Sequence, residues 1–249
     1  MTINSQIIFK IKENLDKVKP ELSKEKKERM YKILNPDIED YLILGVKTKD
    51  IEKIVREVQN NFDPPFKQVK EVFKSLAQSN VEEYKFAAFF FLNRYKKQFN
   101  PKIPFLFRDE YFPYCHTWST CDSCCIRVLG PFLAKEKNSL LAINTINNWS
   151  SDNSLWIRRA SIVILLKIVM VHKDFDESYI FQKVEEMLNY KDENYIEKAI
   201  GWLLKTCSKY KPNIIKDYLI ENKVKFSRLI LRYASEKLAK EARQSILKK

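Results

Sequence analysis

Glycine and histidine are scarce in this chain, and each shortage excludes a class of site. Only three glycines occur among 249 residues, whereas average usage of about 7% would give roughly 17. Gly45, Gly130 and Gly201 lie far apart, which excludes a glycine-rich phosphate loop or a dinucleotide fingerprint. The two histidines, His116 and His172, are too distant in sequence for an H-E-x-x-H zinc motif or a three-histidine site.

The chain also has too few glycines for many hairpin turns, and it has no long apolar run. A hairpin-rich β architecture needs glycine at its turns, so few glycines argue against one. The longest apolar stretches, such as Ala87–Leu92, fall well short of the roughly 18 residues of a membrane span. Residues 1–13 mix polar and apolar side chains, and we therefore expect no signal peptide and no membrane partner.

The five cysteines are predicted to be free, buried thiols. Their odd number, in a chain far longer than a disulfide scaffold, suits a reducing cytoplasm. Four lie within 115–125, and Cys121 and Cys124 have the C-x-x-C spacing of metal and redox sites. A second such pair and a βαβ context are both missing. Because Cys121 and Cys125 share an apolar helical stripe that continues to Phe132, we expect them in the core.

An excess of positive charge points to a polyanionic partner. Lys and Arg number 45 against 32 Asp and Glu, a net charge of +13. Residues 190–249 hold 15 of the basic and 7 of the acidic residues. This surplus attracts DNA or RNA over long range. The alternative is a lysine-rich composition that only solvates helix surfaces.

Apolar spacing predicts helices along the whole chain. Positions i, i+3, i+4 and i+7 are apolar through most of it, as in 51–58 and 196–207. No convincing strand pattern and no low-complexity linker interrupt the helices. We therefore predict an all-α fold in one continuous domain, residues 1–249.

The predicted helices repeat. An aromatic residue precedes a small residue by four positions at Tyr84, Trp156 and Tyr195, and Trp118 falls between the first two. The successive aromatic spacings are 34, 38 and 39 residues, which is typical of TPR, HEAT and armadillo helix pairs. Such pairs stack into an α-solenoid superhelix with a concave surface, here expected to be a basic groove.

One position in the repeat is unusual because it carries a carboxylate. Asp122 stands where the other copies have alanine, one helical turn after Trp118. A carboxylate near a packing position is costly unless a cation meets it; the plainer alternative is a helix-start aspartate that caps or pairs with lysine. Stacked repeats would bring Arg159, or its counterpart Lys198, and Trp202 to the same surface. Such an acidic spot in a basic groove suits stabilisation of positive charge.

Five segments, taken in order, resemble the AlkD-type DNA alkylation repair glycosylases. The resemblance covers most of the chain and rests on the following stretches: 41–48, 83–88, the Trp118–Asp122 motif, 152–160 and 198–204. It implies a HEAT-like superhelix that wraps around double-stranded DNA. It also implies removal of cationic alkylated purines, of the 7-methylguanine and 3-methyladenine type, without flipping of the base. One departure is Ser119, where many relatives carry an acidic or aromatic residue.

The resemblance also implies roles for individual residues. Asp122 would be the catalytic carboxylate, Trp118 and Trp202 would pack against the deoxyribose, and Arg159 would hold a phosphate. The further candidates for DNA contacts are Arg158, Lys198, Lys205, Arg228 and Arg232.

The chemistry fits these roles. Cleavage of an N-glycosidic bond gives an oxocarbenium-like sugar, and a cationic purine leaves without a general acid. One carboxylate therefore suffices, and no metal ion or cofactor is required. We expect a monomer in the cytoplasm, on the nucleoid in a prokaryote, that acts in base excision repair. The alternatives are a non-catalytic HEAT-repeat DNA-binding protein and, less favoured, a protein–protein scaffold.

Overall fold

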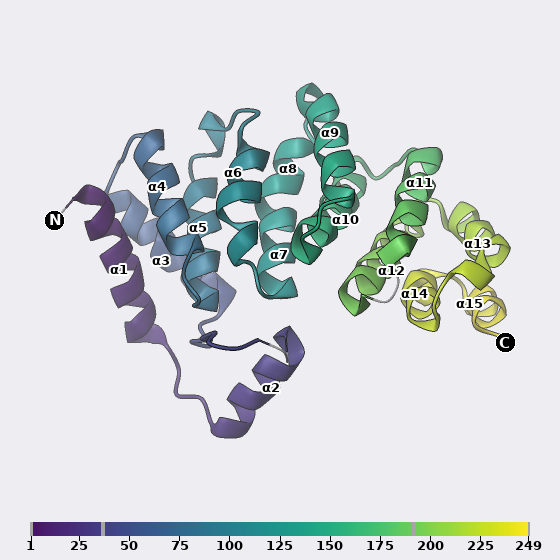
Figure 1. Cartoon of the computed structure of the whole chain (residues 1–249), viewed down its shortest axis with the longest axis horizontal. Helices are drawn as coiled ribbons and strands as arrows, with labels where there is room; N and C mark the ends of the chain where they lie inside the picture. Colours follow the sequence, from purple (N-terminus) through teal and green to yellow (C-terminus); the bar gives the residue numbers. More distant parts are fainter. Residues whose placement is uncertain (1, 36–37, 191–192, 249) are drawn as a thin grey trace. The chain divides into compact units, whose positions relative to one another are not determined.

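The computed structural model describes residues 2–35, 38–190 and 193–248, and over these residues the fold is all-α (Figure 1). The described residues form no strand, and their single β-bridge joins Leu42 to Val81. The predicted all-α helical-repeat class is confirmed. No described helix is long and apolar enough to cross a membrane.

The chain divides into two compact units, Met1–Cys124 and Cys125–Lys249. The division falls between α7 (Trp118–Cys124) and the π-helical segment η3 (Cys125–Leu129) that follows it directly in sequence. The single domain expected over residues 1–249 stays a prediction.

The first unit is built around α5 (Glu82–Asn93), which is buried on nearly all sides. The helices of this unit besides α5 and α7 are α1 (Ile3–Val18), α2 (Lys24–Leu34), α3 (Thr48–Asn61), α4 (Phe66–Ala77) and α6 (Ile103–Glu110). α5 packs against α3, α4 and α7. In contrast, α2 has no buried residue and lies apart from α1 and α3–α5 (Figure 1).

The second unit is built around α10 (Leu155–His172), which packs against α8, α9 and α12. Its other helices are α8 (Gly130–Leu133), α9 (Ser139–Ser150), α11 (Glu177–Met187), α12 (Asn194–Cys207), α13 (Pro212–Glu221), α14 (Arg228–Ala234) and α15 (Lys240–Leu247). Gly201 lets α12 approach α14 closely, because a Cβ at this position would lie 2.5 Å from Cβ of Tyr233. A small residue is therefore required there.

The aromatic residues of the predicted repeat share one structural position. Tyr84, Trp118, Trp156 and Tyr195 each lie within the first three residues of a helix, in α5, α7, α10 and α12 respectively. The 34- to 39-residue spacing therefore measures the distance between successive equivalent helices. This agrees with the predicted register, while assignment of the repeats to the HEAT type stays a prediction.

Candidate functional site

Helix α7 carries the first half of the predicted site. Thr117 caps this helix, since its Oγ1 accepts a hydrogen bond from the backbone N–H of Thr120 at 3.2 Å. Trp118, the first helical residue, is half-buried, and its Nε1 donates to the carbonyl oxygen of Ile33 at 2.9 Å. Asp122 follows one turn later and is only 7% exposed. The predicted indole and carboxylate therefore do lie on one short helix, the carboxylate largely shielded from water.

A buried carboxyl group anchors the start of α7 to α5. Glu82 accepts hydrogen bonds from the hydroxyl groups of Tyr41 and Thr117, the second at 3.0 Å. Burial raises the pKa of Glu82, and the negative charge of Glu83 raises it further. Glu82 thus ties three segments together: the extended stretch at Tyr41, the N-terminus of α5 and the cap of α7.

The neighbouring carboxylate, Glu83, organises the loop before α3. Its two oxygens accept the backbone N–H groups of Leu44, Gly45 and Val46 at 2.9, 2.7 and 3.2 Å. Gly45 has φ = +83°, a left-handed conformation that favours glycine. Burial raises the pKa of Glu83, although the three N–H donors oppose this shift.

We expect Glu83→Ala to destabilise the first unit by about 3 kcal/mol, because three N–H donors would lose a charged acceptor in a largely water-free position. Urea unfolding followed by circular dichroism measures the loss. The control is Glu71→Ala, since Glu71 is exposed and, among the described residues, forms an ion pair only with Lys74, 3.6 Å away; it should change stability by less than about 1 kcal/mol. Equal losses of stability in the two variants would contradict the role of Glu83 in holding the loop before α3.

Lys85 is a fully buried cation on the same helix. It has no exposed surface, and its Nζ donates to the carbonyl oxygen of Ala77 at 2.7 Å. Burial lowers the pKa of Lys85 from 10.5 to about 8. The folded chain therefore releases this proton at a lower pH than the unfolded chain does.

This shift predicts a pH dependence of stability. Between pH about 8 and 10.5 the unfolded state holds a proton that the folded state has lost, so raising the pH stabilises the folded state. Relative to Lys85→Met, the free energy of unfolding of the wild type should rise by on the order of 3 kcal/mol as the pH is raised across this window. Below the window the difference between the two proteins should not change with pH. Urea unfolding of both proteins at several pH values tests this. A difference that is flat or falls with pH would contradict it.

The second unit carries the remaining predicted residues on α10 and α12. Arg159 is 5% exposed, and its guanidinium donates to the carbonyl oxygen of Tyr195. Lys198 lies with its Nζ 5.8 Å from the centre of the Tyr195 ring, and Trp202 is half-buried two turns along α12. Within this unit, Arg159 is thus tied to the N-terminal end of α12. The grouping of Arg159 and Trp202 with Asp122 stays a prediction.

The other predicted DNA contacts differ in how far their charges are already engaged. Arg158 donates to both carboxylate oxygens of Glu193, at 2.6 and 2.9 Å, and its guanidinium lies 4.3 Å from the centre of the Tyr190 ring. Lys205 pairs with Glu236 at 2.7 Å. Because Arg158 is only 6% exposed and pairs with Glu193, we expect it to have a structural role: its ion pair joins α10 to the start of α12.

Two arginines near the C-terminal end are exposed. Arg228 donates to the carbonyl oxygen of Leu247, so part of its guanidinium is occupied. Arg232 is exposed, and within the part of the chain that the structure describes it makes no ion pair. Of the predicted contacts, Arg232 is the one most available to a phosphate.

None of the five cysteines forms a disulfide and all are buried, which confirms the prediction of buried thiols. Burial raises the pKa of Cys115 well above its usual range, so this thiol is a poor nucleophile. Over residues 2–35, 38–190 and 193–248, no three His, Cys, Asp or Glu side chains gather into a group that could hold a metal ion.

Comparison with known proteins identifies the family. The model of the DNA alkylation repair enzyme family matches residues 11–238, nearly the whole chain. The chain belongs to the DNA alkylation repair enzyme family. This membership confirms the resemblance derived from the sequence motifs and supports a role in the repair of alkylated DNA.

A solved structure shares the fold of this chain. It is a predicted DNA alkylation repair enzyme from Enterococcus faecalis, with a TM-score of 0.68 and 16% sequence identity. The similarity covers 87% of this chain and 94% of the E. faecalis chain. No match was found among curated proteins.

Proposed function

We propose that this member of the DNA alkylation repair enzyme family is a glycosylase that hydrolyses the N-glycosidic bond of cationic alkylated purines in duplex DNA, the first step of base excision repair. The observation that carries the proposal is Asp122, 7% exposed and one turn from the half-buried Trp118, in a chain of net charge +13. A carboxylate of this kind would repel phosphate, so it suits a centre of developing positive charge.

The proposed reaction needs only stabilisation of charge. The bond between C1′ and the purine nitrogen breaks, and its electron pair stays with the purine and neutralises the positively charged ring. Water adds its hydroxyl group to C1′ and releases a proton. Asp122 stabilises the oxocarbenium-like sugar, and the indoles of Trp118 and Trp202 contribute roughly 0.5–2 kcal/mol each by cation–π attraction.

The proposed binding surface consists of basic side chains. Arg159 holds a phosphate near the lesion, while Lys198, Lys205, Arg228 and Arg232 bind the flanking backbone. A monomer suffices for this, and because the cationic purine leaves without protonation, the reaction as written requires no metal ion or cofactor. The resemblance also implies cleavage without base flipping, and we include this in the proposal.

Base release tests the proposal. Duplex DNA methylated with a simple alkylating agent is incubated with the protein, and the free bases are separated by chromatography. We expect 7-methylguanine and 3-methyladenine to appear, with no guanine or adenine from undamaged DNA. Salt-sensitive duplex binding without any base release would instead support the non-catalytic DNA-binding function.

A further inference from the structure

The short helix that carries Asp122 is held at its start by buried hydrogen bonds. Helix α7 has seven residues, and a helix of this length has little stability of its own. Thr117, which caps it, and Thr120 in its first turn have no exposed surface, and their hydroxyl oxygens lie 2.9 Å apart. The hydroxyl group of Tyr111 donates to the carbonyl oxygen of Thr120 at 3.3 Å. Packed neighbours therefore determine where α7 begins and in which direction it runs.

One carboxyl group joins this start to the rest of the first unit. Glu82, the first residue of α5, is 4% exposed and accepts the hydroxyl groups of Tyr41 and Thr117. The hydroxyl group of Ser119, in the first turn of α7, hydrogen-bonds to Glu82 as well. A carboxyl group keeps an acceptor oxygen whether it is ionised or neutral. The attachment of α7 therefore does not depend on the charge of Glu82.

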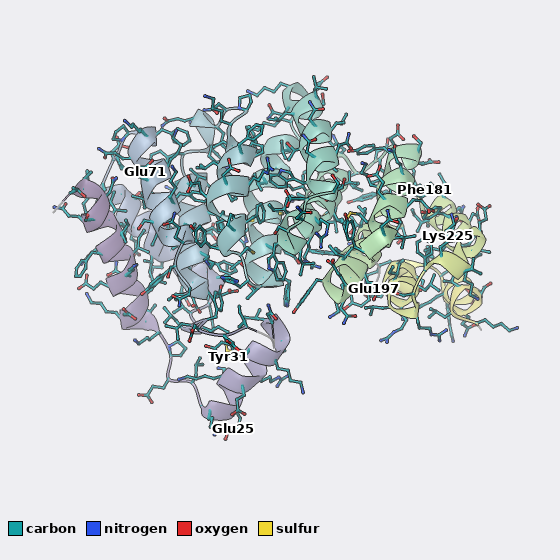
Figure 2. The ribbon with its side chains drawn as sticks, in the orientation of Figure 1. Glu25, Tyr31, Glu71, Phe181, Glu197 and Lys225 are labelled. Carbon is teal, nitrogen blue, oxygen red and sulfur yellow. The ribbon has the colours of Figure 1, made fainter. Side chains whose placement is uncertain are left out.

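Helix α2 connects the same two segments from outside. The hydroxyl group of Tyr31, labelled in Figure 2, donates to the carbonyl oxygen of Tyr41 at 2.6 Å. Asn35, just after the helix, donates through Nδ2 to the carbonyl oxygen of His116 at 2.8 Å. The stretch at Tyr41 and the residues before α7 are thus tied together both by the carboxyl group of Glu82 and by α2.

Stability alone does not require a polar network here. A buried polar group costs free energy unless it is hydrogen-bonded, and replacing both bonded partners by apolar groups of the same shape is often nearly neutral. A network in which the members are bonded does, however, fix one arrangement of the backbone around it. The element fixed by this network is the one that carries Trp118 and Asp122.

The placement of Asp122 is sensitive to the direction of α7. Five positions separate Thr117 from Asp122, which is about 7.5 Å along a helix axis. A tilt of α7 by about 10° at its cap would therefore move Asp122 by on the order of 1 Å. Misplacement of a reacting group by this distance can lower a rate about a hundredfold.

We infer that Glu82 is a positioning residue for base excision, because it sets the direction of α7 and so holds Asp122 where the sugar develops positive charge. The inference rests on the proposed glycosylase function. Since Glu82 is almost fully buried, it influences the reaction only through α7. Its loss should slow the chemical step and leave duplex affinity unchanged.

Two neighbouring substitutions separate positioning from folding. Glu82→Ala and Glu83→Ala each remove a buried carboxyl group from the first turn of α5, but the hydrogen bonds of Glu83 go to the loop before α3. In single-turnover release of 7-methylguanine, Glu82→Ala should lower the rate by about thirty- to a hundredfold. Glu83→Ala should stay within about threefold of the wild type. Fluorescence anisotropy should show unchanged duplex affinity in both variants.

Substitutions of the cap residue test the connection to α7. Thr117→Val keeps the shape of the side chain and loses the hydroxyl group, whereas Thr117→Ser keeps the hydroxyl group. Thr117→Val should release base as slowly as Glu82→Ala does, and Thr117→Ser at about the wild-type rate. Combining Glu82→Ala with Thr117→Val should slow release no further than either change alone, because the two groups act as one unit.

Hydrogen exchange detects the attachment of α7 without relying on activity. Mass spectrometry should show faster exchange over residues 118–124 in Glu82→Ala than in the wild type, and no change there in Glu83→Ala. Thermal unfolding verifies that each variant is folded in the assay. If Glu82→Ala is not, the comparison of Thr117→Val with Thr117→Ser decides the matter.

The outcomes distinguish this inference from the proposed function. Base release at the wild-type rate by Glu82→Ala or Thr117→Val, or an equal loss in Glu83→Ala, would overturn the positioning role and leave the glycosylase intact. A wild type that releases no base would refute the glycosylase. Exchange over residues 118–124 would then still decide whether Glu82 holds α7, and unchanged exchange in Glu82→Ala would refute that as well.

Discussion

Asp122→Asn is expected to lower the rate of base release from methylated duplex DNA by at least about a hundred- to a thousandfold, the usual loss when one group that stabilises transition-state charge is removed. Asparagine keeps the volume of the side chain but carries no charge. Single-turnover release of 7-methylguanine, with enzyme in excess over DNA, measures the chemical step directly. Duplex affinity should stay similar or become tighter, since a group that repels phosphate is gone.

A matched substitution tests whether the loss of base release is specific to Asp122. Asp217 is exposed on α13 and pairs with Lys216 at 3.1 Å; Asp217→Asn makes the same chemical change outside the proposed site. It should release base at the wild-type rate. If Asp122→Asn also does so while the wild type is active, Asp122 is not the catalytic carboxylate.

Raising the salt concentration from roughly 50 to 200 mM is expected to weaken duplex binding by about a hundred- to a thousandfold, as four to six phosphate contacts require. Each contact releases condensed counterions, so the logarithm of the binding constant falls with the logarithm of the salt concentration by about 0.9 per contact. Fluorescence anisotropy with an undamaged duplex, at several salt concentrations, gives the slope. A slope near zero would contradict DNA binding through these side chains.

Two arginine variants assign the contacts. Arg232→Gln should make the salt dependence of duplex binding shallower, by about 0.9 in the slope of the logarithm of the binding constant against the logarithm of the salt concentration. The reason is that this side chain is exposed and makes no ion pair within the described part of the chain. Arg158→Gln should leave the slope nearly unchanged and instead lower stability, since the ion pair with Glu193 involves a buried guanidinium. A shallower salt dependence in Arg158→Gln would instead show that Arg158 contacts a phosphate.

The helices and their repeat were predictable because local periodicity produces them. The apolar stripe at 196–207 predicted a helix that the structure places at Asn194–Cys207. The stripe through Cys121, Cys125 and Phe132 was likewise correct about burial. The apolar pattern did not reveal the π-helix over Cys125–Leu129. In a π-helix each backbone N–H bonds to the carbonyl five residues earlier in place of four, and the types of residue need not differ from those of an α-helix.

Glu82, Glu83 and Lys85 escaped prediction. Charged residues at the start of a helix are ordinarily exposed, and the sequence of α5 offers only one hint of burial, the uninterrupted apolar run at 86–92 that follows. A helix that is apolar all round is enclosed by its neighbours, so its first turn is buried as well. That signal could have identified these residues as buried, but not their partners.

The sequence by itself determined the all-α helical repeat, the burial of the thiols, the family and the proximity of Trp118 and Asp122 on one helical turn. Each of these depends on residues a few positions apart, or on motifs that occur in order. Only the tertiary structure decided that Glu82 meets Tyr41, 41 positions earlier, and Thr117, 35 positions later, and that Arg158 meets Glu193, 35 positions later. Partners of buried charges are chosen by packing between distant helices, which local periodicity does not encode.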